Sequence, residues 1–264
     1  MLFRDEPWPD GTPSWVDLMA PDKGKAVTFY SALLGWEVRA GTAETGYYGM
    51  ATIAGRPVAG LGEIPAAQAD AAPGWTTYLA VSDVDKVVAA VVEAGGGVHA
   101  PPMDVLDEGR MALVADPTGA MFGLWQAGKH AGTQVLAAPG AVAWNECMTT
   151  DFEAAKAFYS GVFGYGFDDM SAPGFQYGVL TVAGEVVGGL GGLPGGGPSH
   201  WGTYFSVEDA DAAAAKVIEL GGAVLNPPSD SPHGKVTVVA DDQGSEFRLI
   251  APNEQSGRPE GWGA

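Results

Sequence analysis

Hydrophobic and polar positions along this chain follow two periods that alternate in a fixed order. Apolar residues between Asp22 and Gly35 recur at helical spacing, with Asp22 suited to cap the start of a helix and Gly35 to end it. The residues from Trp15 to Met19 alternate as a strand does, and three short strand-like runs follow the helix, WEVRA, YYGMATI and PVAGLGEI. The pattern therefore predicts a strand, a helix and three more strands.

The next stretch repeats that order. TTYLAVS is typical of a strand, Asp83 is placed to cap a helix that continues to Ala94, and GVHA, RMALVA and MFGLWQA are typical of strands. Asp22 and Asp83 are 61 residues apart. We therefore expect two βαβββ units in this half of the chain.

The whole pattern returns in the second half. WVDLMAPD and FYSALLGW reappear as WNECMTTD and FYSGVFGY, with Trp15 and Trp144 129 residues apart, and ADPTG reappears as ADDQG. A repeat of this length indicates a duplicated domain. We expect an α+β protein of four βαβββ units, with the first domain at 1–132, a linker at 133–139, the second domain at 140–254 and a flexible tail at 255–264.

Composition narrows the range of partners. The 264 residues are 46% hydrophobic and 17% charged, with a net charge of −19, so the surface should repel nucleic acid and anionic membranes. No run approaches 18 apolar residues, and we expect a soluble, cytoplasmic protein. Cys147 is the only cysteine, which excludes an internal disulfide and a cysteine cluster for zinc. Strand alternation turns its side chain to the face opposite that of its two neighbours, so we expect a buried, inert thiol.

Four such units, with D…FY…LGW after a first strand and a DPTG turn before a last strand, resemble the vicinal oxygen chelate superfamily of glyoxalases, bleomycin-resistance proteins and extradiol dioxygenases. The resemblance covers about Ser14 to Ile250 and implies two tandem glyoxalase-like domains with cup-shaped mixed sheets. More narrowly, the chain looks like duplicated actinobacterial members described as glyoxalase-like or hydroxylase-like. Since four units already supply the usual pair of domains, we expect a monomer or a homodimer.

The resemblance also implies where a metal would be bound. Metal-using members take ligands seven residues before the aspartate that caps a helix and seven residues after the aspartate of the DP-x-G turn. In this chain those positions hold residues that are not normal ligands of a divalent metal: Trp15, Thr76, Trp144, Gly202, Gly123 and Arg248. The histidines His99, His130, His200 and His233 are each interpreted as surface or loop residues. We therefore expect no metal and no other cofactor.

Strand alternation predicts which side chains line the cups instead, because every second residue of a strand faces the same way. Large aromatic and sulfur-containing side chains of this kind are typical of a pocket for an aromatic or polyketide-like molecule. Trp75 and Trp201 should face the opposite side and pack under helices. The predicted ligand-binding residues are Trp15, Met19, Tyr48, Thr76, Met121, Trp125, Trp144, Met148 and Tyr177.

A carboxylate recurs at one inward position, Asp17 in the first half and Glu146 in the second. Desolvation would raise its pKa toward the range of a general acid or base. Tyr78 and Tyr204 are expected to donate hydrogen bonds. Arg248, whose counterpart in the first half is Gly123, is expected to stabilise negative charge. The resemblance implies that units of both domains complete each cup. Arg248 would then lie near Asp17. There are two alternative interpretations. The tryptophans would fill the space of an absent metal site, and the carboxylates would hydrogen-bond neighbouring backbone segments.

Two functions remain open. The favoured one is a metal-independent enzyme that isomerises, cyclises or hydroxylates a hydrophobic, oxygen-rich small molecule by acid–base chemistry. The alternative is a protein that binds a drug or metabolite without converting it. Unequal cups, with a cation in only one, indicate that a single cup is functional.

Overall fold

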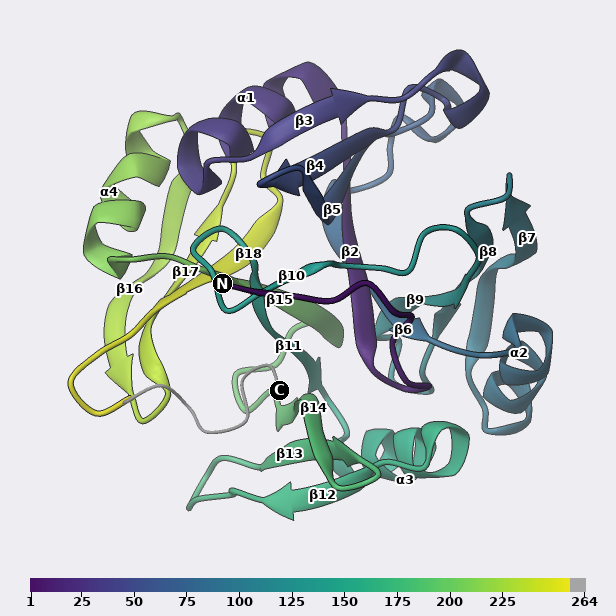
Figure 1. Ribbon diagram of the computed structural model, residues 1–264. Helices are drawn as coiled ribbons and strands as arrows, with labels where there is room; N and C mark the ends of the chain where they lie inside the picture. Colours follow the sequence, from purple (N-terminus) through teal and green to yellow (C-terminus); the bar gives the residue numbers. More distant parts are fainter. Residues whose placement is uncertain (257–264) are drawn as a thin grey trace.

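Two eight-stranded mixed sheets dominate the computed structural model, which describes residues 1–256 (Figure 1). Neighbouring strands of the first sheet are, in order, β3 (Glu37–Ala40), β4 (Gly49–Ile53), β5 (Arg56–Glu63), β2 (Pro13–Ala20), β6 (Gly74–Ala80), β9 (Met121–Ala127), β8 (Gly109–Ala115) and β7 (Gly97–Val105). The second sheet repeats this order with β12 (Gly166–Asp169), β13 (Tyr177–Val182), β14 (Glu185–Gly192), β11 (Val142–Thr149), β15 (His200–Ser206), β18 (Glu246–Ala251), β17 (Gly234–Ala240) and β16 (Ala223–Ser231). Each sheet thus joins two βαβββ units, and the predicted α+β architecture is confirmed.

Each unit contributes one α-helix, and the predicted helix signals are confirmed. The helices are α1 (Lys23–Leu34), α2 (Val84–Glu93), α3 (Phe152–Phe163) and α4 (Ala210–Glu219). In all four, an aspartate before the first turn accepts a hydrogen bond from a backbone N–H of that turn. Gly35 and Gly164 end α1 and α3 in the left-handed conformation, with φ of 71° and 69°.

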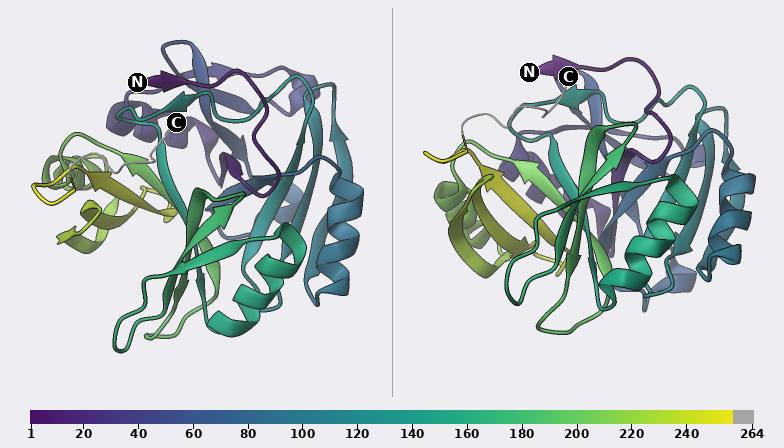
Figure 2. Two further views of the ribbon diagram at one scale, coloured as in Figure 1. Left: turned by 60° about the horizontal axis from the view of Figure 1, so that its bottom comes forward. Right: turned by 90° about the horizontal axis from the view of Figure 1, so that it is seen from below.

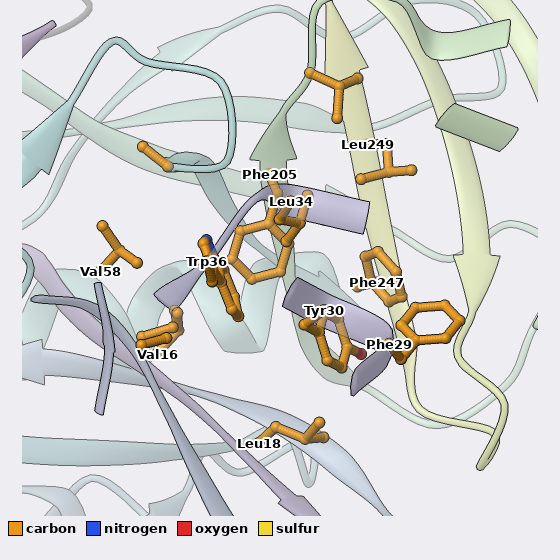
Figure 3. Packing of buried hydrophobic residues seen from close by; sticks show 14 of the residues in the cluster. Val16, Leu18, Phe29, Tyr30, Leu34, Trp36, Val58, Phe205, Phe247 and Leu249 are labelled. Atoms are coloured by element: carbon orange, nitrogen blue, oxygen red, sulfur yellow. The ribbon is translucent and has the colours of Figure 1, made fainter. Parts of the chain in front are cut away.

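The hydrophobic cores cross from one sheet to the other. One core combines α1, β2 and β5 of the first unit with α4, β15 and β18 of the fourth, and the other combines the second and third units. Figure 3 shows Phe205, Phe247 and Leu249 of the second sheet around Tyr30 and Leu34 of α1. The blue α2 and teal α3 correspondingly lie side by side in both views of Figure 2. The two large cores are therefore shared between the halves, and a small cluster around Trp15, Tyr78 and Trp125 belongs to the first half alone.

Duplicated polar contacts fix the two halves against each other. At the centre, the Thr77 hydroxyl lies 3.0 Å from Asn145 Oδ1 and 3.4 Å from the Thr203 hydroxyl. The aromatic residue that follows α1, Trp36, donates to the Gly140 carbonyl at 2.8 Å, and its counterpart Tyr165 donates to the Gly11 carbonyl. The repeated LGW and FGY sequences therefore join the halves.

The turns ADPTG and ADDQG also lie at this junction. Asp241 accepts a hydrogen bond from the Tyr30 hydroxyl of α1 at 3.0 Å, and Tyr30 in turn accepts one from Trp75 Nε1 at 3.0 Å. Trp201 donates to Tyr159 of α3 at 2.8 Å. The prediction that Trp75 and Trp201 face away from the cups and pack under helices is thereby confirmed.

The segment that joins the two sheets also pairs with the start of the chain and with β2. Its strand β10 (Val135–Leu136) pairs with β1 (Leu2–Phe3) at the start of the chain. Thr133 N–H donates to the Ser14 carbonyl at 2.7 Å, which holds the segment against β2. Within residues 1–256, no helix is long and apolar enough to cross a membrane. Most of the predicted flexible tail, from 257 onward, lies outside the described residues.

Removing the Tyr30 hydroxyl should weaken the junction between the halves. In Tyr30→Phe, Trp75 Nε1 and Asp241 Oδ2 each lose their buried partner. We expect the free energy of unfolding in urea to fall by about 1–3 kcal/mol. Tyr47→Phe, at a side chain that is 59% exposed, is the control and should change it by less than about 0.5 kcal/mol. Equal effects of the two substitutions would contradict the described role of Tyr30.

Candidate functional site

The inner face of the first sheet carries a chain of hydrogen bonds centred on Asp17. Trp15 Nε1 donates to the Tyr48 hydroxyl at 3.1 Å. Tyr48 and Tyr78 both donate to Asp17 Oδ2, each at 3.1 Å. Strand pairing explains the grouping, since Trp15 lies opposite Tyr78 and Asp17 lies beside Gly60. The result is a carboxylate held between two phenols.

The second sheet repeats this network around Glu146. Trp144 Nε1 donates to the Tyr177 hydroxyl at 3.2 Å, and Tyr177 donates to Glu146 Oε2 at 2.9 Å. Tyr204 donates to Glu146 Oε1 at 2.6 Å. A tryptophan, a carboxylate and two tyrosines thus form the same constellation in both cups.

Glycines make room for these networks. A Cβ atom at Gly60 or Gly189 would overlap the hydroxyl of Tyr48 or Tyr177, and a Cβ atom at Gly123 would overlap the Tyr78 ring. These glycines lie on last strands, where the resemblance implied metal ligands. The space beside these positions is therefore filled by tyrosine side chains.

The side chains that line the cups are not a suitable set of ligands for a divalent metal ion. Within residues 1–256, no three histidine, cysteine, aspartate or glutamate side chains lie close enough to hold one. Burial and the neighbouring carboxylate raise the pKa of Tyr78 well above its ordinary value, so its hydroxyl stays protonated and donates to Asp17. Burial and Glu146 likewise raise the pKa of Tyr204.

The first cup is covered by a side chain whose packing role the sequence interpretation missed. His130 lies in a loop, as expected, but its ring packs edge-on against Trp15, with 4.3 Å between ring centroids, and 5.5 Å from Trp125. Trp125 Nε1 donates to the His130 carbonyl at 2.9 Å. Burial lowers the pKa of His130 to about 4, so the ring is neutral at pH 7. Trp15 and Trp125 are 5% and 6% exposed beneath it.

Asp17 lies in this closed cup with one oxygen unsatisfied. Among the residues that the structure describes, none forms a hydrogen bond with its buried Oδ1, while Oδ2 accepts both tyrosine hydroxyls. Burial raises the pKa of Asp17 to about 7, and the hydrogen bonds from Tyr48 and Tyr78 lower it by less. Asp17 therefore changes its charge near neutral pH.

The second cup is more open. Trp144, Tyr177 and Tyr204 are half-buried, whereas their counterparts Trp15 and Tyr78 in the first cup are buried. Gln255, which follows β18 as His130 follows β9, is exposed.

Arg248 lies in the second cup, so its expected position near Asp17 is wrong. Each sheet builds its own cup, and Arg248 is paired with Tyr204 across β18 and β15. Its guanidinium carbon lies 5.7 Å from the centre of the Tyr204 ring, and its Nη2 lies 3.0 Å from His200 Nε2. His200 was not predicted to take part; only its position two residues before Gly202 hinted at it.

The remaining predicted residues lie around these networks. Met19 and Met148 place their sulfur atoms over Gly62 and Gly191, on the same face as the carboxylates. Thr76 is half-buried opposite Asp17, whereas Met121 is 45% exposed at the start of β9. Cys147 is buried on the opposite face as predicted, and burial raises the pKa of its thiol well above the usual value.

Comparison with known proteins defines the class. Residues 12–124 match the model of the Glyoxalase/Bleomycin resistance protein/Dioxygenase superfamily, and residues 142–250 match that of the glyoxalase-like domain. The chain belongs to this superfamily and contains two tandem copies of its domain.

Two curated relatives extend over nearly the full length. The chain is 42% identical to "Putative glyoxylase CFP32" of Mycobacterium tuberculosis, over 93% of this chain and 96% of the relative. It is 34% identical to the anthracycline biosynthesis protein DnrV of Streptomyces peucetius, over 92% and 94% of the two chains.

Solved structures of low identity share the fold. The 2,3-dioxygenase LapB of Pseudomonas sp. KL28 superposes with a TM-score of 0.62 at 13% identity, over 92% of this chain and 93% of that one. The Mn(II)-bound glyoxalase of Novosphingobium aromaticivorans superposes with a TM-score of 0.64 at 17% identity, over 92% of this chain and 85% of that one.

The protonation of Asp17 should make stability depend on pH. Because the folded protein holds this proton more tightly than the unfolded chain, the stabilisation is fully present below the ordinary pKa of 3.8 and is lost as pH rises through about 7. We expect Asp17→Asn to gain up to about 4 kcal/mol relative to the unsubstituted protein between pH 4 and pH 8. Urea unfolding across this range measures the difference. Parallel pH profiles of the two proteins would contradict the raised pKa.

Proposed function

We propose that this protein is a metal-independent enzyme that modifies a hydrophobic, oxygen-rich aromatic or polyketide-type molecule by acid–base chemistry in its second cup. The observation that carries the proposal is the grouping of Glu146, Tyr177, Tyr204 and Arg248 around half-buried aromatic rings. A carboxylate, two phenols and a guanidinium can remove a proton and stabilise the charge that remains.

The proposed chemistry begins at a carbon next to a carbonyl group. Glu146 takes the proton, and the electron pair of the broken C–H bond moves to the carbonyl oxygen. Tyr204 and Arg248 stabilise the resulting enolate, since the raised pKa of Tyr204 keeps its hydroxyl protonated as a donor. Return of the proton from Glu146 to a different atom gives an isomerisation. In a cyclisation, the enolate carbon attacks a second carbonyl, the electron pair of its C=O π bond moves to oxygen, and the resulting alkoxide takes the proton from Glu146.

The shape of the cup and the relatives support the substrate class. Phe175 and Tyr177 stack with 5.6 Å between ring centroids and an interplanar angle of 16°. Flat aromatic walls of this kind suit a planar ligand. The similarity to DnrV and DauV, both named for anthracycline biosynthesis, favours a polycyclic aromatic molecule.

Metal independence is part of the proposal, supported by the donor set rather than by any missing ion. The family's ligand positions carry tryptophan, threonine, glycine and arginine, and the Arg248 guanidinium lies over Gly202. A cation adjacent to a guanidinium is disfavoured by charge repulsion. The single, buried free cysteine fits a reducing cytoplasm, where we propose that a monomer or homodimer acts.

Binding without conversion is the second candidate. It is favoured by one observation: both oxygens of Glu146 already accept a hydrogen bond from a tyrosine. A carboxylate occupied in this way would serve to position the aromatic walls.

The duplicated networks provide a matched test of catalysis. Glu146→Gln should lower turnover of an aromatic polyketide, identified by mass analysis of a screened library, by about 100-fold to 10,000-fold. Asp17→Asn, the same change in the closed cup, should leave turnover within about twofold. Ligand affinity, measured by tryptophan fluorescence, should stay similar in both variants. Full turnover by Glu146→Gln would refute the catalytic role, and ligand binding without any turnover would support the second candidate.

Chelation tests metal independence. Dialysis against EDTA, followed by metal analysis, should leave turnover unchanged, because none of the proposed steps uses a cation. Loss of turnover that is restored by manganese, iron or zinc would contradict the proposal.

A further inference from the structure

The second cup contains a cationic pair that the first cup lacks. Arg248 and His200 occupy the positions that Gly123 and Gly74 hold in the first half. The Arg248 side chain is only 9% exposed. Burying a cation costs free energy unless an opposite charge balances it. The surroundings of Arg248 therefore indicate which ligand could supply that charge.

His200 orients Arg248 without neutralising it. His200 Nδ1 lies 3.0 Å from the Pro198 carbonyl oxygen, which can only accept, so this nitrogen carries the proton. Nε2 is then free to accept from Arg248 Nη2 at 3.0 Å. The imidazole is therefore neutral and acts as a fixed support for the guanidinium.

The charge of Arg248 is only partly balanced by the protein. Glu246 Oε1 lies 3.2 Å from Nη2, but the Glu246 side chain is 45% exposed, at the rim of the cup. Within residues 1–256, Nε and Nη1 of Arg248 make no hydrogen bond. The guanidinium lies over Gly202, where a side chain would collide with it, and Glu146 pairs with Gly202 across the strands. Nε and Nη1 thus remain available next to the proposed base as two separate donors on different edges of the guanidinium.

We propose that Arg248, positioned by His200, is a subsite for one anionic group of the substrate, a carboxylate or an ionised acidic enol or phenol on a planar aromatic body. A charged donor such as Nη1 makes a strong hydrogen bond to one oxygen of such a group. The net charge of −19 disfavours multiply charged ligands such as phosphate esters, so a single, delocalised charge is expected. The inference rests on the proposed function, since it takes the second cup as the substrate site.

Equilibrium binding of a matched pair of probes tests this subsite. The probes are 2-naphthoate and its neutral isostere 2-naphthamide, titrated at pH 7.5 by calorimetry. The unsubstituted protein should bind naphthoate at least about tenfold more tightly, as expected for a charge-assisted hydrogen bond. Arg248→Gln should bring the affinity ratio close to one, and His200→Ala, which loosens the guanidinium, should lower it part of the way. The control Arg110→Gln, at an exposed arginine paired with Asp85 and Asp104, should leave the ratio unchanged.

Each outcome decides the inference separately from the proposed chemistry. Equal affinities of the unsubstituted protein for the two probes, no binding of naphthoate, or a preference that survives Arg248→Gln would overturn the anionic subsite. None of these results depends on turnover. Conversely, full turnover by Glu146→Gln would refute the proposed acid–base step, while the ratio of the affinities for naphthoate and naphthamide would be unchanged.

Discussion

A carboxylate on the inner face of a β-sheet must be hydrogen-bonded, and both cups of this protein are arranged around that requirement. Asp17 and Glu146 each accept hydrogen bonds from two tyrosine hydroxyls, and one of these tyrosines is held by a tryptophan. The tyrosines reach the carboxylates only because glycines stand on the last strands. One of these glycines, Gly123, stands at a position where the resemblance to metal-using relatives implied a ligand.

The halves keep this network but differ at its edges. In the first cup His130 packs over Trp15 and Trp125, while Asp17 keeps one oxygen without a partner among residues 1–256. In the second cup Tyr177 and Tyr204 are half-buried, and Arg248 adds a cation. The two copies of one network therefore differ in burial and in charge.

Much of the fold could be predicted because its signals are local. Aspartate caps such as Asp22 and alternating strands such as Trp15–Met19 fixed the elements, and alternation alone showed that Trp75 faces the helices. The positions of His130 and Arg248 depend instead on which units share a sheet and which share a core. Periodicity assigns a residue to a face of a strand, but it does not say which other strand lies opposite. That information came only from the three-dimensional arrangement.

The central claim is that the second cup receives the ligand while the first stays closed. The indole N–H resonances of Trp15 and Trp144 report on the two networks within one sample, since each donates to a tyrosine at the edge of its carboxylate. Titration with a hydroxyanthraquinone should shift the Trp144 signal in the ¹H–¹⁵N spectrum and leave the Trp15 signal in place. A shift of Trp15 alone, or of both signals equally, would contradict the account.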